Sequence, residues 1–149
     1  MNDVWVALAR LEDIVLWSEA VQSARCDGPA RQGVGARRTC RLRGGITIAE
    51  RWTVWEEGRS FTYEGTGLPL VERAINTWSV APQGQNTLLS TCAQVTTKGG
   101  AFGRLLEPLF AMRARRLSRR SLAAFTHLVE HGTAPPAGHS RLPAPLASC

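Results

Sequence analysis

Arg38 and Glu50 are the two residues whose types and spacing point most directly to chemistry. Each stands in a run of alternating apolar and polar residues, on the side that carries the apolar members. Because a buried charge is costly unless it is paired, we expect the two side chains to meet inside the protein. The pair then has two interpretations, a polar anchor for a ligand in an apolar pocket or a structural ion pair. A register one residue away would place both side chains outside.

Glu50 and Tyr63 are the candidate catalytic residues. A desolvated carboxyl can act as a general acid or base, and a tyrosine hydroxyl can move a proton. The sequence has no nucleophile elbow, phosphate-binding loop or dinucleotide fingerprint. His127 and His131 have a metal-like helical spacing but no obvious acidic third ligand, so we expect neither a metal nor a cofactor.

Large aromatic rings form the predicted inner wall of the sheet. Asn76 and the Tyr63 hydroxyl share this wall and need partners if they are buried, which favours a pocket over simple core packing. From the last helix, apolar side chains are expected to form a floor or lid. The candidate ligand-binding residues from this reasoning are Arg38, Glu50, Trp52, Phe61, Tyr63, Asn76, Trp78, Leu109, Met112 and Leu117.

These residues are positioned by a run of predicted strands followed by one long helix. Two short helices, Val4–Ala9 and Ile14–Trp17, open the chain, and Val21–Cys26 is a further candidate strand. The Gly44-Gly45 pair is a strong hairpin signal between the first two main strands. The five main predicted strands are Val34–Leu42, Ile46–Trp55, Ser60–Glu64, Arg73–Val80 and Leu88–Thr97.

The predicted last helix runs from Ala101 to His131, with Pro108 as a kink or break. One apolar stripe is expected to face the core, and Gly132 is a plausible stop. The stripe consists of Phe102, Leu105, Leu106, Leu109, Phe110, Leu117, Phe125 and Leu128, and the arginines of the same helix are Arg113, Arg115, Arg116, Arg119 and Arg120.

Composition limits the classes of partner. The net charge is +6, yet no recognisable nucleic-acid module or exposed aromatic set accompanies it, so no nucleic-acid partner is expected. The arginine cluster could bind anionic lipid or nucleic acid, or form a solvated face. No apolar run approaches the length of a membrane span and no signal peptide is recognisable, which predicts a cytoplasmic protein without integral membrane association.

Several short segments, in this order and spacing, resemble the START/polyketide cyclase superfamily, also called SRPBCC or helix-grip proteins. The resemblance extends from about Val4 to Glu130. Within the superfamily, the chain is most similar to the bacterial polyketide cyclase/dehydrase and lipid-transport-like subgroup. The segments are Gly35–Arg38, Ile48–Trp52, Val54–Glu56, Phe61–Glu64, Gly67–Pro69, Thr77–Val80 and Lys98–Gly100.

The resemblance implies an α+β helix-grip domain over residues 1–132, in which a curved antiparallel sheet wraps around the C-terminal helix. A flexible, proline-rich tail is expected over 133–149. This sequence lacks the strand that normally precedes the first helix in this family. The sheet would then have an unpaired edge, which favours a homodimer or aggregation.

The resemblance also implies a ligand class and adds Leu68 to the candidate binding residues, at the pocket entrance. The first hypothesis is binding of a hydrophobic or amphipathic small molecule, such as a lipid, polyketide or aromatic compound, between sheet and helix. The second is a cyclase or dehydratase that uses the same cavity. The third is an interaction module that presents the open sheet edge or the arginine-rich helix.

Overall fold

The computed structural model describes residues 1–136, without the side chains of residues 101, 102, 104 and 106. Most of the predicted tail, 137–149, therefore lies outside the described residues. The elements are α1 (Asn2–Ala9), the 3-10 helix η1 (Leu11–Asp13), α2 (Ile14–Trp17), β1 (Val21–Asp27), β2 (Arg37–Leu42), β3 (Thr47–Glu56), β4 (Ser60–Thr66), β5 (Val71–Gln83), β6 (Asn86–Thr97) and α3 (Gly100–His131).

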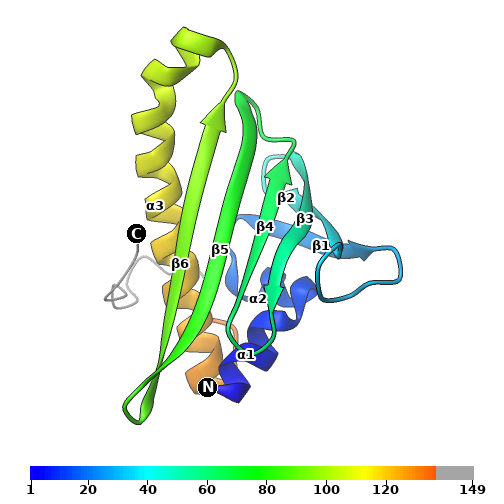
Figure 1. Cartoon of the computed structure of the whole chain (residues 1–149), viewed down its shortest axis with the longest axis vertical. Coiled ribbons are helices and arrows are strands. Elements are labelled where there is room, and N and C mark those ends of the chain that lie inside the picture. The colour runs from blue at the N-terminus through cyan, green and yellow to red at the C-terminus, as the bar shows by residue number, and fades with distance from the viewer. Residues whose placement is uncertain (137–149) are drawn as a thin grey trace.

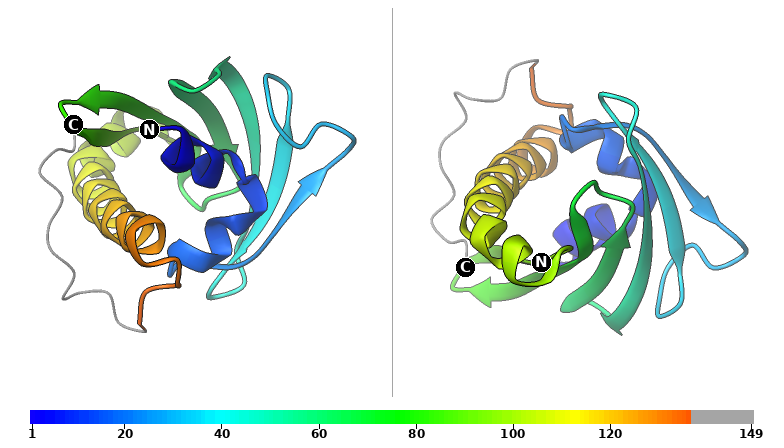
Figure 2. Two further views of the ribbon diagram at one scale, coloured as in Figure 1. Left: turned by 90° about the horizontal axis from the view of Figure 1, so that it is seen from below. Right: turned by 90° about the horizontal axis from the view of Figure 1, so that it is seen from above.

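The six strands form one antiparallel meander in the order β1-β2-β3-β4-β5-β6. The sheet curves and α3 runs along its inner side beside β6, as Figure 1 shows. Viewed along the long axis in Figure 2, the sheet and α3 surround the two N-terminal helices. This arrangement confirms the predicted α+β helix-grip fold. The sheet does not close, and β1 and β6 are its two edges.

Glycines allow the tight turns that bring neighbouring strands together. Gly44 and Gly45, with φ of 99° and 85°, connect β2 to β3 and confirm the predicted hairpin. Gly67, with φ of 101°, lies against β3, where an added Cβ would stand 2.6 Å from the Thr47 carbonyl oxygen. The loop between β4 and β5 can therefore approach β3 this closely only with glycine at position 67.

The predicted alternation holds through β2 and the first half of β3. Ala36, Arg38 and Cys40 are buried, as are Glu50 and Trp52 on the neighbouring strand. These side chains form the inner wall of the sheet, as the period of two requires.

The alternation in the sequence also predicts Val34 and Val54 on this wall, but both are exposed. Val54 is 45% exposed because a register shift between Trp52 and Val54 reverses the alternation of β3. Trp55 then packs against the core in its place. Val34 is 65% exposed because it lies in the loop before β2, which begins only at Arg37.

The last helix is continuous through Pro108, so the predicted break is absent, although its first turns are bent in Figure 1. The predicted apolar stripe is wrong in its first half, where Leu105 is 76% and Leu109 54% exposed, whereas Phe125 is fully buried. Leu105 and Phe125 are separated by about 200° around an ideal helix axis, so the two cannot face one core.

No helix within residues 1–136 combines the length and the apolar character needed to cross a bilayer.

Candidate functional site

Arg38 and Glu50 form a buried ion pair at the centre of the inner wall. They are directly opposite each other on β2 and β3, and the Arg38 Nε donates to Glu50 Oε2 at 2.6 Å. Their side chains are only 3% and 5% exposed. The guanidinium also donates to the backbone carbonyl of Leu11 in η1. The predicted meeting of the two charges is therefore observed, and it ties the sheet to the N-terminal helices.

Aromatic rings and a thiol complete the surroundings of this pair. The guanidinium carbon of Arg38 lies 5.0 Å from the centre of the Trp52 ring and 5.9 Å from that of Tyr63. The Cys40 thiol donates to the same Glu50 oxygen, at 3.4 Å. Both hydrogen bonds to the carboxylate thus reach Oε2, and Oε1 has no donor among the residues that the structure describes.

Burial and the ion pair shift the pKa values of the neighbouring groups. Burial lowers the pKa of Arg38, but the charge and hydrogen bond of Glu50 outweigh it, so the net pKa is raised. Burial, followed by the Glu50 charge, raises the pKa of Cys40 to about 12. The same two causes raise the pKa of Tyr63, opposed by Arg38 and the Trp78 indole. Cys40 and Tyr63 therefore stay protonated at neutral pH, and each can donate a hydrogen bond.

A cavity of about 200 Å³ lies beside the ion pair, between the sheet, α2 and α3. Most of its wall is apolar, and Trp17 and Trp78 contribute two rings that contact each other edge to face at 5.3 Å between centres. Polar groups come from Glu50, Tyr63 and Asn76, among others. An apolar enclosure with a few converging polar groups is the usual form of a small-molecule site.

Other polar side chains of the wall also lack a hydrogen-bond partner within residues 1–136, among them the buried Trp17 indole N–H. The Asn76 carboxamide, half-buried on β5, forms no hydrogen bond within the described part of the chain. The hydroxyl of Ser121, on a residue that is 9% exposed, is likewise without a partner among residues 1–136. These groups, together with Glu50 Oε1, can bind a polar atom of a molecule in the cavity.

The predicted site residues fall into three groups. Arg38, Trp52 and Phe61 do not line the cavity: the first supports Glu50, and the two rings, whose centres are 5.9 Å apart, pack in the core. Leu109 and Met112, expected in a floor or lid, are 54% and 64% exposed and also do not line it, because that part of α3 turns them outward. The structure brings together around the cavity Glu50, Tyr63, Leu68, Asn76, Trp78 and Leu117.

Much of the cavity wall was not identified from the sequence. Ile14, Trp17 and Ser18 enter it from α2 and the residue that follows, and Ala114 and Ser121 enter it from α3. The only signal for Trp17 was its apolar position in a short helix, which does not distinguish a core residue from a cavity residue. The small α3 residues carry no signal until the helix is placed against the sheet.

The two histidines of α3 stack with ring centres 4.2 Å apart, and a ring nitrogen of His131 lies 3.1 Å from the His127 carbonyl oxygen. Within residues 1–136, no three side chains of His, Cys, Asp or Glu are grouped in a way that could hold a metal ion.

Comparison with protein families matches residues 1–130 to the family described as polyketide cyclase / dehydrase and lipid transport. Comparison with curated proteins gives no match. The family match covers every element from α1 to all but the last residue of α3.

Solved structures share the fold at low sequence identity. The ZhuI aromatase/cyclase from Streptomyces sp. R1128 superposes with a TM-score of 0.71 at 15% identity, over 92% of this chain and 90% of that one. A protein from Thermus thermophilus gives 0.65 at 17% identity, over 88% and 90%. A truncated norcoclaurine synthase from Thalictrum flavum gives 0.63 at 16% identity, over 87% and 86%. At these identities the likeness establishes the fold alone.

Proposed function

We propose that the cavity binds a neutral aromatic molecule of one or two rings. The chain belongs to the polyketide cyclase / dehydrase and lipid transport family, and the proposal starts from this membership. The cavity beside Glu50 and Asn76 is the observation that carries this proposal. Its apolar wall would supply most of the affinity by excluding water from the rings, and its polar groups would orient the molecule.

The size of the cavity limits the ligand. A cavity of about 150 Å³ in another protein admits benzene, and pockets for drug-sized ligands begin near about 300 Å³. At about 200 Å³, the present cavity lies between the two and favours one or two fused rings over an extended lipid chain. The volume of the cavity therefore restricts the ligand expected from the sequence, a lipid, polyketide or aromatic compound, to a small molecule of one or two rings.

The polar groups define the chemistry of the ligand. Glu50 Oε1 is an acceptor, and the charge of its carboxylate is compensated by Arg38, so a hydroxyl donor on the ligand would suit it. Asn76 offers both a donor and an acceptor. A second carboxylate next to Glu50 would be repelled, which supports a neutral phenol-like molecule over a fatty acid.

Titration with 2-naphthol, followed by tryptophan fluorescence, tests the proposal because Trp17 and Trp78 line the cavity. Naphthalene, which lacks the hydroxyl, is expected to bind at least about tenfold more weakly, because a hydrogen bond to a charged acceptor contributes about 1.5–3 kcal/mol. Palmitate is expected to bind more weakly than either, since its chain exceeds the cavity.

A pair of matched substitutions on one helix separates the cavity from the surface. Ala114→Phe places a ring in the cavity and should abolish 2-naphthol binding, whereas Ala111→Phe, on an exposed position one turn away, should leave it unchanged. Equal affinity of both variants, or equal affinity of naphthalene and 2-naphthol, would contradict the proposal. Circular dichroism of both variants verifies that they fold.

Catalysis is the second candidate function, favoured by Glu50 Oε1, which has no donor within residues 1–136 and lies in the same cavity as Tyr63. In that case Glu50 would accept a proton from an activated carbon and Tyr63 would donate to a carbonyl oxygen. Ring closure of a short synthetic poly-β-ketone, followed by absorbance, should then be lost in Glu50→Gln, while 2-naphthol should still bind about as tightly as naphthalene binds the wild type. Unchanged turnover in Glu50→Gln would exclude this role.

We also propose a homodimer, because β1 lies at an edge of the sheet and pairs with a strand on one side only. Analytical ultracentrifugation tests it directly. A monomer at concentrations of about 100 μM would exclude a dimer of ordinary affinity.

A further inference from the structure

We propose that the outward face of the first half of α3 docks on the surface of an anionic phospholipid membrane. This inference is independent of the ligand in the cavity. It rests on a cluster of exposed apolar side chains, which no other residue within 1–136 buries, and on the arginines that follow it along the same helix.

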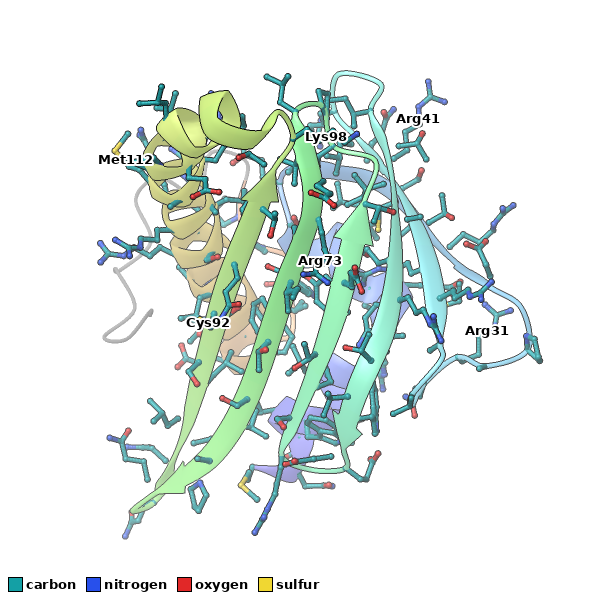
Figure 3. All side chains as sticks on the ribbon, turned by 45° about the horizontal axis from the view of Figure 1, so that its top comes forward. Arg31, Arg41, Arg73, Cys92, Lys98 and Met112 are labelled. Atoms are coloured by element: carbon teal, nitrogen blue, oxygen red, sulfur yellow. The ribbon has the colours of Figure 1, made fainter. Side chains whose placement is uncertain are left out.

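The apolar part of this face consists of Leu105, Leu109 and Met112, which are 76%, 54% and 64% exposed. On an ideal helix these three residues lie within about 60° of one another, so they form one patch together with the exposed Pro108. Figure 3 shows Met112 on the side of α3 that points away from the sheet. Large apolar side chains gathered on one exposed face are typical of an interaction surface.

The basic part begins at Arg113, which follows Met112 directly in the chain. Residues 105–120 contain five arginines and one glutamate. Within residues 1–136, Arg113, Arg115 and Arg116 form no ion pair, and all three are exposed. Arg116 lies in line with Leu105 and Met112 around the helix, so charge and apolar surface face the same way.

This combination fits a membrane surface better than the alternatives. Apolar side chains gain from insertion at the boundary of headgroups and acyl chains, and arginines next to them gain from the negative lipid phosphates. A nucleic acid would satisfy the arginines but would offer Leu105 and Leu109 no hydrocarbon. A solvated face would satisfy the arginines but would not account for the apolar cluster.

The opposite face of the same helix lines the cavity through Ala114, Leu117 and Ser121. Leu117 is itself 48% exposed and so lies at the rim between cavity and solvent. Docking through the outward face would therefore leave α3 between the membrane and the cavity.

Flotation of the full chain with phosphatidylcholine vesicles that contain about 30% phosphatidylglycerol tests the proposal, with pure phosphatidylcholine vesicles as the comparison. The chain should float with the anionic vesicles only, and high salt should release part of it. Arg116→Glu should weaken binding by about thirtyfold, because it changes the charge by two units at the surface. Met112→Glu should weaken it by about tenfold or more.

Two control variants separate this face from the general basicity of the protein. Arg41→Glu makes the same charge change on β2, on the far side of the molecule from Met112 in Figure 3, and should leave binding nearly unchanged. Val34→Glu makes the apolar-to-acidic change in the exposed loop before β2 and should also have little effect.

Three outcomes would overturn the proposal. The first is no binding to anionic vesicles, and the second is an equal loss in Arg41→Glu and Arg116→Glu. The third is binding of a random RNA that Arg116→Glu abolishes while vesicles do not bind, which would assign the face to nucleic acid. Since all four variants change exposed side chains, circular dichroism should show that each remains folded.

Discussion

Removal of Arg38 is the most demanding test of the buried ion pair. Arg38→Met keeps much of the length and apolar stem of the side chain but leaves the Glu50 carboxylate, 5% exposed, without its positive partner. The substitution also removes the donor to the Leu11 carbonyl and the cation above the Trp52 ring.

The expected cost follows from these contacts. Breaking a buried ion pair by removing one partner costs about 3–5 kcal/mol, because the remaining charge stays buried and uncompensated. The orphaned Leu11 carbonyl places the value toward the upper end of this range. A domain of this size has an unfolding free energy of about 5–15 kcal/mol, so Arg38→Met should be strongly destabilised yet still fold in the cold.

Urea unfolding at low temperature, for the wild type, Arg38→Met, Glu50→Gln and the double variant, measures the coupling between the two residues. The double variant replaces the unpaired carboxylate by a neutral amide and should recover at least about 2 kcal/mol relative to the sum of the single losses. If the losses simply add, or if Arg38→Met costs less than about 1 kcal/mol, the side chains do not act as a buried pair.

Two further predictions concern pH. The Glu57 carboxylate accepts hydrogen bonds from the Trp55 and Trp5 indoles at 2.7 and 2.8 Å, which lower its pKa from 4.5. Glu57→Gln should therefore lower the Tm by its full amount above pH 4.5, and the Tm difference should shrink as acid protonates Glu57 in the wild type. A Tm difference that grows in acid would refute this prediction. Burial, followed by the Glu50 charge, raises the pKa of the Cys40 thiol from 9.0 to about 12, so the folded state binds this proton more tightly than the unfolded state. Between these two pH values, the unfolding free energy of the wild type should fall more steeply than that of Cys40→Ala, by up to about 1.4 kcal/mol per pH unit. An identical pH dependence of the two unfolding free energies, measured with urea, would contradict this prediction.

The sequence predicted what depends on short-range alternation. Arg38 and Glu50 each sit in a run with a period of two, and a period of two is preserved as long as the strand is regular. The bulge between Trp52 and Val54 breaks that regularity, and the residue types at these positions do not predict a bulge. The prediction for β3 is therefore correct up to Trp52 and wrong at Val54.

The long helix and the cavity were harder to predict for a different reason. A stripe drawn from Leu105 to Phe125 gathers small errors in angle over many turns, until its two ends face opposite sides. The cavity wall depends on where α2 and α3 lie against the sheet, so Trp17 and Ala114 cannot be assigned to it before the fold is known. Neither position differs in residue type from an ordinary core or surface residue.

The two faces of α3 suggest opposite requirements for what each one binds. Inside, the negative charge of Glu50 is already compensated by Arg38, so the cavity presents an acceptor without an excess of positive charge to attract an anion. Outside, Arg113 and Arg116 have no carboxylate partner in the described part of the chain and present an excess of positive charge next to exposed leucines. An anionic amphiphile should therefore be held at the outer surface and a neutral aromatic molecule in the cavity. Competition between 2-naphthol and anionic vesicles should then be absent, because the two occupy different sides of one helix.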